Sequence, residues 1–318
     1  MEKRALGRTG LHVAPIVFGG NVFGWTIDQK TSCEVLDAFV DHGFDAIDTA
    51  DVYSAWAPGN KGGESETIIG NWLKARPGMR DRVTIFTKVG SGDGGPKAHG
   101  LSEGWILQAA DRSLQRLGIE QIDLYFSHWP DPAGTSYAET LGAYDKLLKA
   151  GKIRSIGVSN VDATQLTEAL AVAKREGLPA YQVLQPEYNL YARSSYDGAL
   201  RDLAIREGLG VVTYFSLASG FLTGKYRSAE DFGKSARGGG MAKYLDARGA
   251  AILAALDQVA LRHSAQPGEV ALAWLIAREG VTAPIASATK VTHVASFARA
   301  AALKLSDQDI AALDTASA

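Results

Sequence analysis

The sequence of 318 residues is poor in cysteine, in long apolar runs and in excess charge of either sign. Cys33 is its only cysteine, so an intrachain disulfide and a cluster of thiolate metal ligands are both excluded. This composition favours a reducing cytoplasm as the compartment. The 33 basic and 35 acidic residues give a net charge of −2, which offers no electrostatic footprint for nucleic acid. We therefore expect no nucleic-acid partner.

Sequence features of membrane proteins are missing as well. Residues 1–5 are polar and contain no apolar signal region, and the longest apolar run, at 270–277, has 8 residues. A run of this length is too short to cross a bilayer and suits a buried helix, so we expect no membrane partner. With 46% hydrophobic residues the chain can bury a large core, and we expect residues 1–318 to form one domain.

The rest of the chain alternates short apolar segments, typical of buried strands, with amphipathic helical segments. The expected strands are 16–18, 46–48, 83–87, 123–127, 153–158, 181–184, 211–214 and 284–286. The expected helices are 29–42, 64–75, 103–117, 137–150, 163–176, 196–207, 246–264 and 291–303. Strands that are each followed by a helix, with no break in composition, predict a closed (β/α)8 TIM barrel of the α/β class.

Glycine-containing segments decide two further points about the fold. Residues 4–6 and 11–13 flank Gly7-Arg8-Thr9-Gly10, which predicts a short N-terminal hairpin. An open doubly wound sheet would require Gly-x-Gly-x-x-Gly directly after the first strand, and the segment 19–24 does not fit that fingerprint. Another glycine-rich segment, 92–95, is expected to be a plain flexible loop.

Four polar side chains follow the predicted strands at the points where these strands end. Asp48 ends the second strand and Tyr53 comes soon after it, whereas Lys88 follows the third strand and His128 follows the fourth. Because the carboxyl ends of parallel strands meet at the mouth of a barrel, we expect these side chains to form one site. There the Lys88 cation would favour the phenolate of Tyr53 and lower its pKa from about 10, which would suit a general acid.

Each of these residues also has a plainer interpretation. Asp48 and Lys88 could form a structural ion pair, and Tyr53 and His128 could be core or rim residues. Lys88 could instead form a Schiff base with a carbonyl substrate, as in aldolases. Asp48, Asp51 and His128 could supply three metal ligands. Their spacing matches no metal motif, however, and Lys88 would oppose a cation, so we expect no metal.

The segment 215–245 interrupts the alternation of strands and helices. It spans roughly thirty residues and includes Gly220, Gly224, Gly233 and Gly238-Gly239-Gly240. Loops of this length inside a compact domain are usually lids, binding loops or disordered segments. The apolar, turn-rich beginning of the segment, 216–225, favours a binding loop.

Three motifs together resemble a known family. They are Asp48-Thr49-Ala50-Asp51-Val52-Tyr53, Gly157-Val158-Ser159-Asn160 and the segment from Tyr214 to Lys225. With Lys88 and His128 in the same order, the chain resembles the aldo-keto reductase family over nearly its whole length. The resemblance implies a (β/α)8 barrel whose N-terminal hairpin closes the bottom. It also implies reversible, NAD(P)H-dependent reduction of an aldehyde or ketone, with a small carbonyl compound as the substrate.

The resemblance further implies roles for individual residues. Tyr53 would donate the proton to the carbonyl oxygen, Lys88 and Asp48 would tune its pKa, and His128 would orient the substrate. The residues implied in cofactor binding are Gly20, Asn21, Ser159, Asn160, Gln185, Tyr214, Ser216, Leu217, Ser219, Gly220, Leu222, Lys225, Ser287 and Lys290. Apart from the resemblance, four aromatic residues on loops at the expected mouth would form a funnel for an apolar or alicyclic ketone: Phe23, Trp25, Trp56 and Trp129.

Within the implied cofactor site, different residues would bind different parts of the cofactor. Ser159, Asn160 and Gln185 would bind the nicotinamide carboxamide, Tyr214 would stack on the ring, and amides near 217–222 with Lys225 would clamp the phosphates. The plainer alternative for Ser159 and Asn160 is that one of them caps the following helix.

The implied cofactor is NADP(H), with NAD(H) as the alternative. Ser287 and Lys290 can bind a 2′-phosphate, and no carboxylate stands there to bind a free ribose hydroxyl. The chain departs from the family at three places. Ser287 stands where the family often has a basic residue, and His293 stands where it usually has an arginine. Ser296-Phe297 stands where the family has an acid and an amide. These departures predict a weaker preference, which strengthens below the pKa of His293, near 6.5. A nucleotide-binding regulatory subunit with weak turnover remains the alternative function.

Overall fold

The structure is a computed structural model that describes residues 1–91, 100–131 and 133–318, so the loop expected at 92–95 lies outside the described residues. Parallel strands close into a barrel in the order β10-β3-β4-β5-β6-β7-β8-β9. Their bounds are β3 Val17–Gly19, β4 Ala46–Asp48, β5 Thr84–Val89, β6 Ile122–Ser127, β7 Ile153–Ser159, β8 Val183–Gln185, β9 Gly210–Thr213 and β10 Ala283–Ala286. The predicted barrel is confirmed, and all its strands lie within a few residues of their expected positions.

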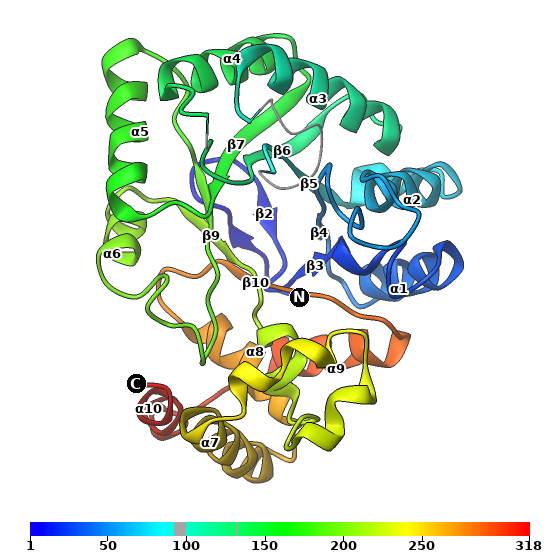
Figure 1. Ribbon diagram of the computed structural model, residues 1–318, viewed down its shortest axis with the longest axis vertical. Coiled ribbons are helices and arrows are strands. Elements are labelled where there is room, and N and C mark those ends of the chain that lie inside the picture. The colour runs from blue at the N-terminus through cyan, green and yellow to red at the C-terminus, as the bar shows by residue number, and fades with distance from the viewer. Residues whose placement is uncertain (92–99, 132) are drawn as a thin grey trace.

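Helices form a ring around the barrel (Figure 1). Their bounds are α1 Gln29–Asp41, α2 Glu64–Lys74, α3 Glu103–Leu117, α4 Tyr137–Lys149, α5 Ala163–Glu176, α6 Ala199–Arg206, α7 Ala247–His263, α8 Pro267–Ala277, α9 Val291–Ala302 and α10 Asp307–Ala316. The apolar run at 270–277 forms most of α8, as expected, and the segment 269–275 is buried. The sequence interpretation missed α10, which packs on α7 near the C-terminus. Among the described residues, no helix is both long enough and apolar enough to cross a membrane.

The N-terminal hairpin closes one end of the barrel, as the resemblance implied. Strands β1 Arg4–Ala5 and β2 His12–Val13 pair antiparallel. Leu6 belongs to one buried cluster with apolar side chains from every barrel strand except β7. Gly7, with a φ of 57°, lies against Gly210 at the start of β9: a β-carbon on Gly7 would come within 2.3 Å of the Gly210 nitrogen. The hairpin therefore occupies the amino-terminal end and leaves the carboxyl-terminal end of the strands free for a site.

Local capping groups set where several helices begin. The Asp28 side chain accepts a hydrogen bond from the Thr31 amide at the start of α1. Asp162 and Gln165 form a reciprocal capping box at the start of α5. The expectation that Ser159 or Asn160 caps this helix is therefore wrong, because Asp162 takes the N-cap position. The side chains of Ser159 and Asn160 remain available at the barrel mouth.

The segment 215–245, which we call the clamp segment, is folded into short 3-10 helices. They are η3 Ala218–Thr223, η4 Ala229–Lys234, η5 Gly238–Gly240 and η6 Ala242–Tyr244. In Figure 1 this segment, in yellow-green to yellow, lies near α7, and its helix η3 packs on α8. Phe221 and Leu222 are buried, so apolar side chains hold this segment against the rest of the protein.

Candidate active site

The residues predicted at three strand ends meet at one point in the barrel mouth. The Lys88 ammonium donates hydrogen bonds to the Asp48 carboxylate (2.6 Å), the Tyr53 hydroxyl (2.9 Å) and the Thr49 carbonyl (2.8 Å). These three acceptors use all three protons of the ammonium. The Lys88 and Asp48 side chains are 0% and 2% exposed, so the pair is buried and its geometry is fixed from several sides.

Gln185 supports Asp48 from the opposite side of the barrel. Its side-chain amide on β8 donates a hydrogen bond to the free Asp48 oxygen at 2.9 Å, while its backbone carbonyl accepts from the Ser159 hydroxyl at 2.7 Å. The sequence interpretation assigned Gln185 to the cofactor alone. The structure links it to the acid as well, because opposite strands of a small barrel approach each other across the interior.

The expected lowering of the Tyr53 pKa is wrong in this structure. Burial first, and the Asp48 carboxylate second, raise the pKa of Tyr53 well above its ordinary value. The hydroxyl donates to Asp48 at 3.2 Å, which stabilises the neutral phenol, and the Lys88 cation is shared with Asp48 and Thr49. Burial in turn lowers the pKa of Lys88, and Asp48 opposes that change. Tyr53 is consequently held as a phenol, the form that can donate a proton.

His128 lies beside this group. Its ring centroid is 5.9 Å from that of Tyr53, and its amide donates to the Val89 carbonyl at 2.8 Å, which fixes it to the end of β5. Burial first, and then the Lys88 cation, hold the pKa of His128 well below its ordinary value. The imidazole is therefore neutral and carries one N–H that it can donate to a carbonyl oxygen.

The residues expected to bind a carboxamide form a connected group next to His128. The Asn160 amide donates to the His128 carbonyl (2.8 Å) and to the Ser159 hydroxyl (3.0 Å). Its oxygen accepts from the Tyr214 hydroxyl at 2.7 Å. Asn160 has a φ of 60°, a left-handed conformation that asparagine tolerates better than most residues and that often marks functional sites. Together with Gln185, these side chains present several donors and acceptors at one edge of the barrel.

The start of the clamp segment has the backbone of an anion-binding turn. Four positions of this turn have a positive φ: Phe215 (52°), Ala218 (46°), Ser219 (56°) and Gly220 (100°). The amides of Leu217 and Ser219 have no hydrogen-bond acceptor within the part of the chain that the structure describes. Strained turns with free amides are suited to phosphate oxygens.

Other predicted members of the clamp segment are already bonded within it. The Leu222 amide donates to the Leu217 carbonyl at 3.2 Å, and the Ser216 hydroxyl donates to the Thr213 carbonyl at 2.9 Å. These two residues shape the turn. Gly220 leaves room for the Lys225 ammonium, which would lie 3.3 Å from a β-carbon at that position.

The sequence interpretation missed Arg237, which lies near the proposed acid. Its guanidinium is 5.4 Å from the centroid of the Trp25 ring, and Tyr53 is among the groups that influence its pKa, which burial lowers. Its Nη2 atom is buried and has no hydrogen-bond partner among the described residues. A buried donor of this kind is costly unless an anion satisfies it. No local motif in the sequence indicates that Arg237 turns inward.

A second basic group lies where the start of α9 meets Lys225 of the clamp segment. Burial, and then the Lys290 and Lys225 cations, lower the pKa of His293, so these three side chains are close enough to interact. The Ser287 hydroxyl donates to the Asn21 amide oxygen at 2.8 Å. Ser287, which follows β10, therefore lies beside Asn21, which follows β3.

Gly20 and the residues at 296–297 have structural roles. A β-carbon on Gly20 would come within 3.0 Å of the Asp48 carbonyl oxygen, so glycine is needed there to let two strands approach. Ser296 donates to the buried Glu269 at 2.8 Å, and Phe297 is buried. The positions where the family has an acid and an amide therefore face the core in this chain.

The predicted aromatic residues divide between the core and the mouth. Phe23 is fully buried and stacks on Phe18 at 5.2 Å, so its expected place in the substrate pocket is wrong. Trp25 and Trp56 contact each other edge to face at 5.6 Å, and the Trp56 ring lies 6.1 Å from that of Tyr53. Trp56 and Trp129 are 49% and 44% exposed, so both are available to an apolar ligand.

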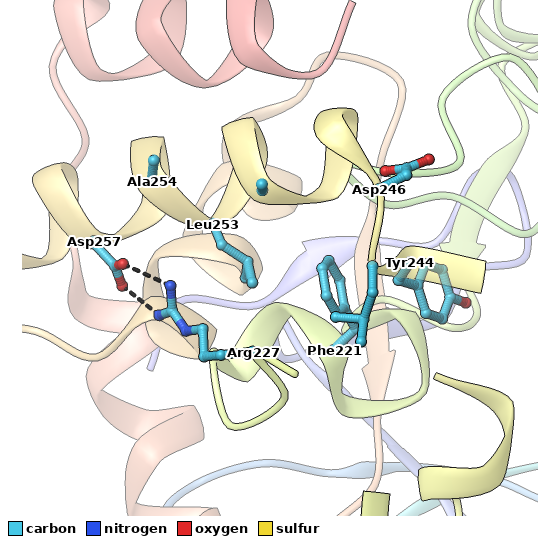
Figure 2. Close-up of a pocket in the computed structure, with 9 residues that line it drawn as sticks. Phe221, Arg227, Tyr244, Asp246, Leu253, Ala254 and Asp257 are labelled. Carbon is cyan, nitrogen blue, oxygen red and sulfur yellow. Dashed lines mark hydrogen bonds and ion pairs between the residues drawn. The ribbon is translucent and has the colours of Figure 1, made fainter. Parts of the chain in front are cut away.

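A separate cavity of about 270 Å³ lies between η3 and α7 (Figure 2). Phe221, Tyr244 and Leu253 line it, and none of the four predicted catalytic residues does. At its rim Arg227 forms an ion pair with Asp257, with both hydrogen bonds at 2.8 Å. The cavity therefore lies behind the clamp segment, outside the barrel mouth. Within the described ranges, no group of three or more His, Cys, Asp or Glu residues is arranged to hold a metal ion.

Comparison with known proteins gives a consistent match. The family model described as "Aldo/keto reductase family" matches residues 15–318. An "Uncharacterized oxidoreductase YrpG" of Bacillus subtilis is 32% identical over 320 residues, covering 98% of this chain and 94% of its own. An "Aldo-keto reductase str7" of Strobilurus tenacellus is 31% identical over 290 residues, covering 88% and 79%. A "Probable voltage-gated potassium channel subunit beta" of Arabidopsis thaliana is 36% identical over 227 residues, covering 71% and 67%.

Proposed function

This chain belongs to the aldo/keto reductase family, which supports an oxidoreductase activity on carbonyl compounds, and we propose that it reversibly reduces an aldehyde or ketone with NADPH. The observation that carries the proposal is the buried Lys88 ammonium, hydrogen-bonded to both Asp48 and the Tyr53 hydroxyl at the strand ends. The direct test is a panel of aldehydes and ketones with NADPH and NADH, following the absorbance of the reduced cofactor. No oxidation of either cofactor across the panel would contradict the proposal.

The proposed reaction divides between the cofactor and the side chains. A bound nicotinamide cofactor supplies the hydride that the carbonyl carbon receives. Tyr53 donates its phenolic proton to the carbonyl oxygen, and Lys88, 2.9 Å away, stabilises the phenolate that remains. His128 donates a hydrogen bond to the same oxygen and orients the carbonyl. The phenolate then recovers a proton from water, which restores the starting state.

The residues of the mouth fit such a cofactor. Asn160, Ser159 and Gln185 would bind the carboxamide, and Tyr214 would lie against the ring. The free amides in the clamp segment, together with Lys225 and Arg237, would bind the diphosphate. The buried Nη2 of Arg237, which has no partner among the described residues, supports this fit because an anion would satisfy it.

Two other functions can be separated from this one by simple experiments. A regulatory subunit, as the channel-subunit name of one relative suggests for that relative, would bind the cofactor and oxidise it only slowly with any carbonyl. An aldolase-type lyase would form a Schiff base through Lys88. Borohydride added with the substrate would trap a lysine adduct only in the lyase, so a mass shift on Lys88 would contradict the reductase proposal.

Replacing Arg237 with Gln should raise the KM for NADPH by roughly 10- to 100-fold, because a hydrogen bond between charged groups contributes about 1.5–3 kcal/mol. The kcat at saturating cofactor should change little. Arg227→Gln is a matched control, since Arg227 belongs to the same segment but pairs with Asp257 outside the mouth. Steady-state kinetics with one fixed carbonyl measures both variants. Equal effects in the two variants would contradict a role of Arg237 in binding the diphosphate.

Replacing Lys290 with Glu should raise the KM for NADPH about tenfold and leave that for NADH nearly unchanged, because only NADPH carries the 2′-phosphate. Since the pKa of His293 is lowered, protonation of His293 should add to the preference only below about pH 6.5. Kinetics with both cofactors from pH 5 to 8 measures this. The placement of the phosphate is wrong if both constants change equally or if NADH is already the better cofactor.

A further inference from the structure

Asp51, an acid that the proposed mechanism does not use, is half-buried and lies directly behind Lys88. The Asp51 amide donates to the Lys88 carbonyl at 3.2 Å, which fixes Asp51 to the strand end that carries the lysine. Its Oδ1 atom is buried and accepts no hydrogen bond from any described residue. The nearby Tyr125 hydroxyl is also buried without a partner in the described part of the chain. Such groups are rare in proteins and call for a physical reason.

A second acid makes the environment of Asp51 unfavourable for another negative charge. Glu66 on α2 is fully buried and accepts hydrogen bonds from Thr87 (2.5 Å) and Arg116 (2.6 Å). Thr87 directly precedes Lys88, so this acid is also part of the wall behind the site. Arg116 is committed to Glu66, which leaves Asp51 without a cation of its own.

Two glycines in the loop before α2 allow Arg116 and the backbone of Asp51 to pack closely against this loop. A β-carbon on Gly63 would come within 2.5 Å of the Arg116 side chain, and one on Gly62 would come within 3.1 Å of the Asp51 carbonyl oxygen. Both glycines have positive φ, near 90°. The loop before α2 therefore lets an arginine and the backbone of Asp51 pack against it closely, and it holds the two acids near each other.

We propose that Asp51, bonded through its amide to the strand end that carries Lys88 and placed beside the buried Glu66, is a positioning residue whose protonation state tunes the Tyr53–Lys88 pair. This inference rests on the proposed reductase function. When Asp51 is negative it attracts the Lys88 cation and adds negative potential at Tyr53, which makes the phenol a weaker acid. When Asp51 is neutral, the cation acts more fully on Tyr53, and carbonyl reduction is faster.

The titration behaviour agrees with this geometry. Burial first, and the Glu66 carboxylate second, raise the pKa of Asp51 to about 7, while Arg116 and Lys88 act in the opposite direction. Asp51 in turn favours the charged form of Lys88. The titratable and charged groups that face Asp51 come from five elements and are Glu66, Lys88, Arg116, Tyr125 and Tyr144.

The test is the pH profile of reduction in the unmodified protein and in Asp51→Asn, at saturating cofactor and carbonyl. The unmodified protein should lose rate by about three- to tenfold as the pH rises through about 7, since a shift of about one unit in an acid's pKa is transmitted only partly to the rate. Asp51→Asn should be as fast at pH 6 and should lack this decline, so that it is the faster protein at pH 8. A purely structural role would slow the variant at every pH.

A second measurement does not depend on turnover. Because the folded-state pKa of Asp51 is raised, its neutral form favours folding and this stability is lost as the pH rises through the folded pKa. Asp51→Asn should therefore gain stability relative to the unmodified protein as the pH rises from about 4 to 8. Asp111→Asn, an exposed acid on α3 that pairs with Lys152, should show neither effect.

The outcomes separate this inference from the function on which it rests. Turnover with the same pH profile in Asp51→Asn as in the unmodified protein overturns the inference. A difference in stability between Asp51→Asn and the unmodified protein that is constant with pH also overturns the inference. Absence of turnover with every carbonyl, together with the expected stability difference, instead contradicts the reductase function and removes the tuning role with it.

Discussion

Tyr53→Phe should reduce kcat for carbonyl reduction by about 10²- to 10⁴-fold, the range expected for loss of a positioned proton donor. The substitution removes only the hydroxyl, which donates to Asp48 and accepts from Lys88. The ring contacts with Trp56 and His128 remain, so the mouth should keep its shape. Cofactor affinity should change little, because Tyr53 is not among the residues proposed to bind the cofactor.

Two measurements are needed to interpret this variant. Steady-state kinetics with a good carbonyl gives the loss in rate, and fluorescence titration with NADPH gives the affinity. Tyr191→Phe is a control with the same chemical change, because the Tyr191 hydroxyl bonds to Asp246 on the clamp side of the protein. If Tyr53→Phe retains the rate of the unmodified protein, Tyr53 is not the acid.

The fold could be predicted well because its barrel strands are short apolar segments that are almost entirely buried. Strand β4 was predicted with its observed bounds, since an apolar run that ends in an acid marks where the chain leaves the barrel. The strand predicted at 83–87 ends two residues too early, because Lys88 and Val89 are fully buried and remain in the ladder of β5. A charged residue normally signals the surface, and only its partner Asp48, distant in sequence, explains why Lys88 does not.

One helix was missed although a local signal was present. Helix α10 begins with a capping box between Ser306 and Asp309, a pattern visible in the sequence. Its apolar face is short, and Asp309 is held by Arg262 and His263 of α7. Polar contacts with α7 therefore help to hold the helix, and a periodicity argument does not detect such contacts.

The residues that form the site could be predicted from the sequence. The hydrogen bonds between them and the directions of their pKa shifts could not. The four residues at strand ends meet as expected, because parallel strands deliver them to one edge. The bond from Gln185 to Asp48 and the inward position of Arg237 depend on which side chains face each other across the mouth. The raised pKa of Tyr53 depends on burial. Burial and contacts across the barrel mouth arise only when segments that are distant in the sequence pack together, so the sequence pattern did not predict them.

The second large effect concerns Lys88, for which the ion-pair and the catalytic interpretations predict different results. Lys88→Met should reduce the free energy of unfolding by about 3–5 kcal/mol, because it leaves the Asp48 carboxylate buried without its cation. It should also reduce kcat by about 10²- to 10³-fold, the effect of removing one donor that stabilises a developing oxyanion. Denaturant unfolding and steady-state kinetics measure the two losses separately.

The double variant Asp48→Asn/Lys88→Met distinguishes the two roles. It removes both charges, so no uncompensated carboxylate stays buried, and Gln185 still has a side-chain oxygen to which it can donate. Most of the lost stability should return. Activity should not return, because the Tyr53 phenolate would have no cation to stabilise it. If the double variant recovers both stability and rate, Asp48 and Lys88 are only a structural pair, and the tuning proposed for Asp51 loses the lysine through which it acts.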